Sequence, residues 1–223
     1  MIKAVVFDAY GTLISTGTGS LDAAQKILDL HGSVITAKAF YADWKKYHRQ
    51  HVDSLTQFVP EETIFLWDLE RLYTQYGLAG NAAQDVRIML DTLGNRTAFP
   101  ESRGVVEQLK RAYTVCIGST TDIEPLMRDL NRSGIVVDRV FTSEGLQVYK
   151  PQKAFYERIL TELSLLPQEV LFVGDSLTDD ISGPKQVGMK TCWVNRKGLA
   201  APVPPPDYEV SDLTGLTAIL EDL

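Results

Sequence analysis

The sequence contains few cysteines, fewer basic than acidic residues and no long apolar run. Each of these shortages argues against a class of protein. Its two cysteines, Cys116 and Cys192, lie in separate apolar segments. Two such cysteines do not make a disulfide framework, so a reducing cytoplasm is the simplest location. The formal net charge of −7 disfavours nucleic acids and anionic membranes as partners, because both bind basic patches.

Membrane and secretory signals are also missing. No apolar run approaches the roughly 18 to 20 residues needed to span a bilayer, and the chain enters a strand-like segment at once, without the apolar stretch of a signal peptide. The 223 residues are 44% hydrophobic and 23% charged, which is an ordinary globular composition. We therefore expect a globular protein of one or two domains.

The sequence does contain an alternation of strand-like and helix-like segments from about residue 99 onward. Together with the apolar run Ala4–Phe7, this alternation predicts an α/β fold, a doubly wound parallel sheet with right-handed crossovers. The later strands are predicted at residues 113–117, 136–141, 170–173 and 191–194. The helices between and after them are predicted at residues 122–133, 151–163, 179–187 and 213–220.

Residues 15–98 show helical periodicity and little strand signal. Apolar and aromatic side chains recur at helical spacing in two stripes, which are Phe40, Trp44, Tyr47 and His51, then Phe65, Leu69 and Leu72. This block interrupts the α/β pattern after its first strand. We therefore predict a core domain of residues 1–14 and 99–223, and an inserted helical cap domain of residues 15–98 over the carboxyl edge of the sheet.

Polar residues follow four apolar runs that we predict to be strands, including a run at residues 146–149, at the point where each strand ends. Because chemistry in open α/β sheets gathers beyond the carboxyl ends of the strands, we expect these residues to share one site. Each of them alone could also be a turn residue, a helix cap or a solvated loop residue. The residues are Asp8 after 4–7, Ser119 after 115–118, Lys150 after 146–149, and Asp175, Asp179 and Asp180 after 170–174.

These residue types suit the chemistry of an anionic substrate. A carboxylate at Asp8 can be a nucleophile or a metal ligand, and Ser119 can donate a hydrogen bond to an anion. Lys150 precedes a predicted helix start, where a cation is electrostatically unfavourable, which indicates a functional role beside Asp8. The three acids within residues 175–180 repel one another unless a cation lies among them, and such an oxygen-rich site favours Mg²⁺.

On these motifs the chain resembles the haloacid dehalogenase-like (HAD) hydrolase superfamily over essentially its whole length. The matching segments are residues 7–13, 119–120, 150–151, 174–176 and 180–183. The resemblance implies a Rossmann-like core with strand order 5-4-1-2-3. It also implies that Asp8 is a covalent nucleophile, that Ser119 binds the anion and that Lys150 positions it. Mg²⁺ would then be held by Asp8, Asp175 and the main-chain carbonyl of Tyr10, with Asp180, rather than Asp179, in a supporting role.

Two branches of this superfamily compete. Its phosphatases place a general acid two residues after the nucleophile, but this chain has Tyr10 there. A halide leaves without protonation, so the metal-independent 2-haloacid dehalogenases need no acid at that position. The segments 8–12, 147–151 with Tyr156, and 191–196 also resemble that branch.

Several dehalogenase features are absent, however. Lys45 and Arg49 stand near the place of the cap arginine, Thr120 replaces an asparagine, and the fourth motif is acidic rather than neutral. We therefore expect a Mg²⁺-dependent phosphatase-like hydrolase acting on a small phosphorylated metabolite. A 2-haloacid dehalogenase and a catalytically weak phospho-ligand binding protein are the alternatives. The candidate substrate-binding residues are Tyr10, Thr120, Lys45 and Arg49.

Overall fold

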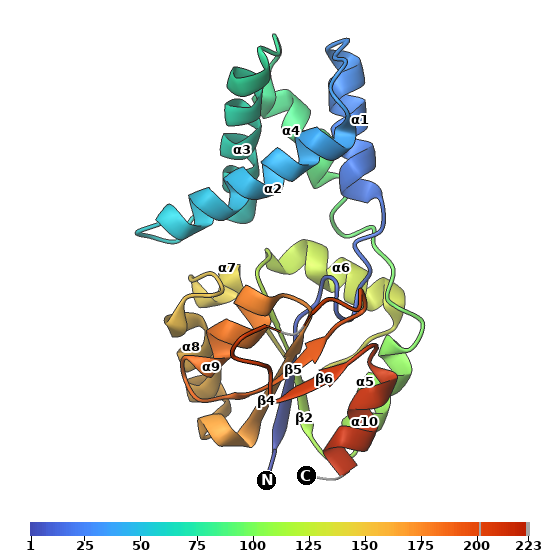
Figure 1. Ribbon diagram of the computed structural model, residues 1–223, viewed down its shortest axis with the longest axis vertical. Coiled ribbons are helices and arrows are strands. Elements are labelled where there is room, and N and C mark those ends of the chain that lie inside the picture. The colour runs from blue at the N-terminus through green and yellow to red at the C-terminus, as the bar shows by residue number, and fades with distance from the viewer. Residues whose placement is uncertain (201, 222–223) are drawn as a thin grey trace. The chain divides into compact units, whose positions relative to one another are not determined.

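The computed structural model describes residues 1–200 and 202–221 and divides the chain into two compact units (Figure 1). One unit is made of Met1–Ser15 and Thr97–Leu223, and the other of Thr16–Arg96. Among the described residues, no helix is both long enough and apolar enough to cross a membrane. The predicted position of the helical segment over the sheet edge stays a prediction, as does the cytoplasmic location.

The first unit contains a six-stranded sheet in the order β3-β2-β1-β4-β5-β6, in which every neighbouring pair is parallel. Read from β5 to β3, this is the predicted order 5-4-1-2-3, so the α/β fold class is confirmed. The sixth strand extends the sheet beyond β5 and was not predicted. The strands are β1 Ala4–Phe7, β2 Thr114–Ser119, β3 Arg139–Thr142, β4 Val170–Gly174, β5 Lys190–Val194 and β6 Tyr208–Val210.

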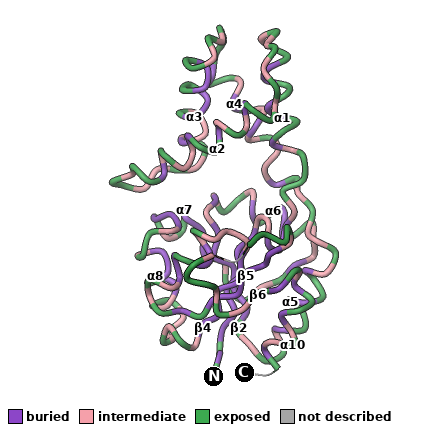
Figure 2. The backbone as a smooth tube through the Cα atoms, in the orientation of Figure 1, coloured by how far each residue is buried: buried purple, intermediate pink, exposed green. Residues whose placement is uncertain are grey.

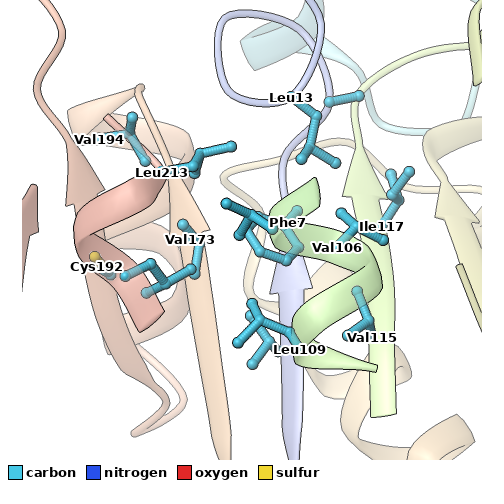
Figure 3. Packing of buried hydrophobic residues seen from close by; sticks show 14 of the residues in the cluster. Phe7, Leu13, Val106, Leu109, Val115, Ile117, Val173, Cys192, Val194 and Leu213 are labelled. Carbon is cyan, nitrogen blue, oxygen red and sulfur yellow. The ribbon is translucent and has the colours of Figure 1, made fainter. Parts of the chain in front are cut away.

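Helices cover both faces of the sheet, so its central strands are apolar throughout. Every residue of β1 and β4 is buried. On one face, Phe7 and Val173 share a cluster with Val106 and Leu109 of α5 and with Leu213 just before α10 (Figure 3). On the other face, the cluster includes residues of α8. These helices are α5 Ser102–Leu109, α6 Ile123–Ser133, α8 Lys153–Leu163 and α10 Thr214–Glu221.

The second unit is helical, as its periodicity predicts. It contains α1 Gly19–Leu30, α2 Ala37–Ser54, α3 Glu61–Tyr76 and α4 Ala82–Leu90. The predicted stripes form its buried core, which holds Phe40, Trp44, Tyr47, Leu69 and Leu72 (Figure 2). The two end members of the stripes, His51 and Phe65, are only partly buried.

The predicted strand at Leu146–Tyr149 is wrong. The short helix α7 spans Ser143–Leu146, and the chain then turns at Gln147, whose φ is 53°. Val148 and Tyr149 are buried but lie in no strand. Their apolar character therefore reports burial and not sheet pairing, and Lys150 reaches the site from a loop.

Other predicted elements also have different bounds in the structure. In place of one helix at 179–187, a π-helix at Leu177–Ser182 leads into the short helix α9, Gly183–Lys185. Pro184 lacks the N–H that a continuous α-helix needs there. The helix predicted from Pro151 begins at Lys153, and the strand predicted at 136–141 is Arg139–Thr142.

The edge strand β6 is joined to β5 through Asp207. Its Oδ2 accepts hydrogen bonds from Thr191 N and Oγ1, both at 3.0 Å, and its Oδ1 lies 3.0 Å from Lys190 Nζ. Burial alone would raise the pKa of Asp207, but the hydrogen bonds from Lys190 and Thr191 lower it below its ordinary value. The ionised carboxylate therefore stabilises the fold.

We expect Asp207→Asn to lower the free energy of unfolding by about 1 kcal/mol at pH 7, because the group is partly exposed and its ion pairs are screened. Since the folded-state pKa is lowered, the wild-type advantage is present above the ordinary pKa of about 3.9 and is lost as the pH falls toward the folded-state value. Urea unfolding of both proteins across pH 3 to 7 measures this. An advantage that grew on acidification would contradict it.

Candidate functional site

Asp8 lies directly after β1, at the carboxyl end of the sheet. Its N–H donates to the carbonyl of Val173 at 2.8 Å, which extends the pairing of β1 with β4. The residue is 6% exposed, and its Oδ1 accepts a hydrogen bond from Lys150 Nζ at 2.7 Å. The sheet therefore presents one oxygen of the carboxylate to a cation and leaves the second oxygen for other chemistry.

Lys150 is the buried cation of the site. Only 1% of this residue is exposed, and its Nζ lies 2.7 Å from both Asp8 Oδ1 and Asp180 Oδ1. Burial alone would lower the pKa of Lys150, but the charges of Asp180 and Asp8 raise it above its ordinary value. Lys150 therefore stays protonated and bridges the two carboxylates.

The segment after β4, residues 175–180, is an acidic turn that brings two further carboxylates to this position. Oxygen atoms of Asp8, Asp175 and Asp180 all lie within 4.8 Å of one another. Ser176 fixes the turn, because its Oγ accepts from Asp179 N at 3.2 Å while its own N–H donates to Asp180 Oδ2 at 2.9 Å. The structure thus brings together four of the predicted residues, which are Asp8, Lys150, Asp175 and Asp180.

Two glycines make room for these acids. A Cβ at Gly11 would lie 2.5 Å from Asp175 Oδ1, and the φ of Gly11 is +99°, a conformation that side chains oppose. A Cβ at Gly174 would lie 2.2 Å from Asp180 Cγ. The glycines of the first and fourth motifs are therefore required by the close approach of the carboxylates.

The carboxylates outnumber the cation at this point of the structure. Burial, followed by the charge of Asp8, raises the pKa of Asp175 to about 6. Burial also raises the pKa of Asp180, although Lys150 opposes this effect. The three acids share the ammonium of Lys150, and Lys197 also acts on Asp175, so the acids still outnumber the cations and a divalent cation would neutralise the excess negative charge.

The donor set fits Mg²⁺, which prefers carboxylate oxygens together with water. Both oxygens of Asp180 are already used, one by Lys150 and the other by Ser176 N, so Asp180 suits a supporting role. Asp8 and Asp175 each retain an oxygen, Oδ2, for which the described residues provide no hydrogen-bond donor. These two carboxylates would hold the ion, and the part of the Tyr10 carbonyl stays a prediction.

The remaining predicted residues of the first unit lie on or beside these loops. Ser119 ends β2 and is 2% exposed, and Thr120 follows it, half-buried. Tyr10 donates its hydroxyl to Asp129 Oδ2 of α6 at 2.9 Å. The phenol group is therefore engaged with a carboxylate that is 0% exposed. The roles of Ser119 and Thr120 in anion binding stay predictions.

Lys45 and Arg49 lie on α2 of the helical unit. Lys45 Nζ is 5.2 Å from the centre of the Tyr41 ring, and Arg49 Nη1 is 3.7 Å from Asp53 Oδ1. These surface contacts do not assign a function to either residue. Their predicted contact with substrate therefore stays a prediction.

Sequence reasoning missed Asp129, the partner of Tyr10. A signal was present, because Asp129 directly precedes Leu130 and follows Leu126 by three residues on the apolar side of α6, and all three are buried. A single acid on an apolar helix face predicts a specific partner, since buried carboxylates are rarely left unpaired. The sequence also did not indicate that Thr12 is a neighbour of Asp175. Thr12 Oγ1 donates a long hydrogen bond of 3.4 Å to Asp175 Oδ1.

Comparison with known proteins places relatives over the whole chain. A family model described as haloacid dehalogenase-like hydrolase matches residues 2–188. (S)-2-haloacid dehalogenase 4A of Burkholderia cepacia is 28% identical over 100% of this chain and 93% of its own length. Glyceraldehyde 3-phosphate phosphatase of Pyrococcus furiosus is 25% identical over 99% and 93%. The solved structure of a dehalogenase with an intermediate complex has a TM-score of 0.80 and 25% identity, over 98% and 96%.

We expect Asp175→Asn to raise the free energy of unfolding by about 0.5–2 kcal/mol at pH 7.5 in the presence of EDTA. The substitution removes one of three crowded carboxylates, and residues crowded for function commonly reduce stability. Urea unfolding measures the difference. The matched control is Asp22→Asn, which removes an exposed carboxylate of α1. If Asp175→Asn were less stable than the wild type, the carboxylates would not be in the conflict that the geometry indicates.

Proposed function

Because the chain belongs to the haloacid dehalogenase-like hydrolases, we propose that it hydrolyses a small substrate through an ester of Asp8, and that the leaving group departs without a proton, as the halide of a 2-haloacid does. The relatives support this activity, since the B. cepacia dehalogenase aligns with the entire chain. They favour the dehalogenase, which the sequence suggested as the alternative, over the expected Mg²⁺-dependent phosphatase. The relatives named here are enzymes and lend no support to a non-catalytic binding protein.

The observation that carries this proposal is the environment of Tyr10. A hydrolase that releases an alkoxide needs a general acid beside the leaving group. Here the residue two positions after Asp8 is a phenol whose proton is donated to Asp129, so it does not protonate a leaving group. A halide needs no such proton, and the geometry therefore suits displacement at carbon.

The other residues of the site suit the two steps of this reaction. Lys150 holds Asp8 Oδ1, so the Oδ2 oxygen attacks the carbon that bears the halide, forms the ester bond and expels the halide ion. Water then attacks the carboxyl carbon of the ester and breaks its bond to the alkyl oxygen. Asp175, which lies within 4.8 Å of Asp8, accepts one proton of that water and passes it to the departing alkyl oxygen, and the second proton of the water is released to solvent. The products are a 2-hydroxyacid and the restored Asp8 carboxylate.

A Mg²⁺-dependent phosphatase is the second candidate, and the uncompensated carboxylates favour it. Asp8 and Asp175 would hold the ion, with Asp180 in support. Bound there, Mg²⁺ would neutralise the negative charge of a phosphoryl group. The full-length similarity to the P. furiosus phosphatase is consistent with this candidate. The two candidates share Asp8 and differ in metal dependence and leaving group.

We expect the wild-type protein to release chloride from (S)-2-chloropropionate in EDTA, and Asp8→Asn to lose at least about 10³-fold of this rate, because an amide is a poor nucleophile. Ion chromatography measures the chloride, and Asp22→Asn serves as the control that changes an acid outside the site. Wild-type turnover by Asp8→Asn would exclude Asp8 as the nucleophile.

If the protein is instead a phosphatase, its rate should depend on the leaving group. With Mg²⁺, 4-nitrophenyl phosphate should then be hydrolysed much faster than glycerol phosphate, since only the alkoxide needs a proton. Tyr10→Asp should raise the glycerol phosphate rate by about 10²–10⁴-fold by restoring a general acid. Phosphate assays on both proteins measure this. Mg²⁺-dependent phosphate release without any chloride release would replace the first candidate with the second.

A further inference from the structure

The side chain of Trp193, on β5, holds the acidic turn through a main-chain carbonyl of that turn. The residue is 1% exposed, and the sheet register pairs it with Gly174 at the end of β4. Its indole Nε1 donates to the main-chain carbonyl of Asp175 at 3.1 Å. A rigid, buried side chain on a strand therefore determines where the acidic turn begins.

Arg196 makes corresponding contacts with the loop that carries the nucleophile. Its Nη2 donates to the main-chain carbonyl of Thr12 at 2.9 Å and lies 2.7 Å from Glu101 Oε1. Its guanidinium lies over the ring of Phe99, 3.6 Å from the centre. These contacts fix the guanidinium plane, so the hydrogen bond to Thr12 has a defined direction.

The two loops held in this way lie against each other. A Cβ at Gly11 would touch the carboxylate of Asp175, and Thr12 Oγ1 faces the same carboxylate. Carboxylate oxygens of Asp8 and Asp175 lie within 4.8 Å of each other, and like charges at this distance repel. Contacts outside the carboxylates must therefore keep the loops at their spacing.

We propose that Trp193 and Arg196 are positioning residues, which set the separation of Asp8 and Asp175 by holding the two loops at the end of β5. The proposal rests on the proposed function for its catalytic consequence, although its structural part is independent of the substrate. Both residues act through main-chain carbonyls, so neither needs to touch the reacting atoms. Small displacements of reacting groups have large effects on rate.

The test compares Trp193→Phe, Arg196→Gln and Arg196→Lys with Tyr113→Phe. Tyr113 is the matched control, since it also donates a side-chain hydrogen bond to a main-chain carbonyl, that of Leu220 at 2.9 Å, but it lies just before β2, at the opposite end of the strands. Amide hydrogen exchange followed by NMR reports each loop separately. The kcat and KM values for (S)-2-chloropropionate, and for 4-nitrophenyl phosphate with Mg²⁺, report the catalytic consequence.

We expect Trp193→Phe to speed exchange of the Asp179 and Asp180 amides, whose bonds to Ser176 hold the acidic turn. Arg196→Gln should instead speed exchange at Leu13 and Ile14, which donate to the Ala9 carbonyl. Both variants should lose about 10- to 100-fold in kcat, as changes around a site's direct ligands commonly do, with little change in KM. Arg196→Lys should recover part of the loss.

Tyr113→Phe should lower the melting temperature and change neither loop nor kcat. The proposal is overturned if exchange at the two loops is unchanged in Trp193→Phe and Arg196→Gln, or if their kcat falls no further than that of Tyr113→Phe. If the wild type hydrolyses neither substrate, the proposed function fails, and the exchange measurements still decide whether the two residues hold the loops.

Discussion

The ammonium of Lys150 is the interaction on which the site depends. It is buried between Asp8 and Asp180 at 2.7 Å from each, and it is the only lysine or arginine paired with either acid among the described residues. Removing one member of a buried ion pair typically costs about 3–5 kcal/mol, because its partners stay buried without compensation. The buried residues Val148 and Tyr149 anchor the loop that leads to Lys150, and the parallel sheet brings the two carboxylates to the same edge.

The same arrangement keeps mutually repelling carboxylates close together in the folded protein. Asp175 adds a third negative charge, and its pKa is raised to about 6 by burial and by Asp8. Close packing against Gly11 and the hydrogen bond from Trp193 to the main-chain carbonyl of Asp175 hold it there. Local strain of this kind is typical of functional sites, where geometry is kept at the expense of stability. A divalent cation or a proton would relieve the conflict, and these two possibilities correspond to the two candidate functions.

Much of this arrangement could be predicted from the sequence, because parallel strands place their carboxyl ends at one edge of the sheet. That rule brings Asp8, Asp175 and Asp180 together from two apolar runs. The prediction of a strand at Leu146–Tyr149 was wrong, because an apolar run indicates burial and this run is buried in a loop that pairs with no strand. The strand Tyr208–Val210 was missed because three residues at a sheet edge carry little periodic signal. The pairing of Asp129 with Tyr10 could not be predicted, because the two residues lie 119 positions apart in the chain.

The branch of the family is the part that sequence patterns leave open. The first motif lacks an acid at Tyr10, which suits a halide, while the fourth motif supplies acids that suit a metal. The structure shows that both features occupy one site, so motif matching alone selects neither. Both candidate reactions use Asp8, and they differ in the atom that water attacks.

A single turnover in H₂¹⁸O, with enzyme in excess over (S)-2-chloropropionate, tests the ester of Asp8 most directly. Water that attacks the carboxyl carbon of the ester leaves its oxygen in Asp8, and the product takes its hydroxyl oxygen from the protein. Mass spectrometry of the peptide that contains Asp8 should therefore show a gain of about 2 Da, the mass difference between ¹⁸O and ¹⁶O, that is absent without substrate. Label in the hydroxyl group of the product, with none in Asp8, would contradict the account, because water would then have displaced the halide itself.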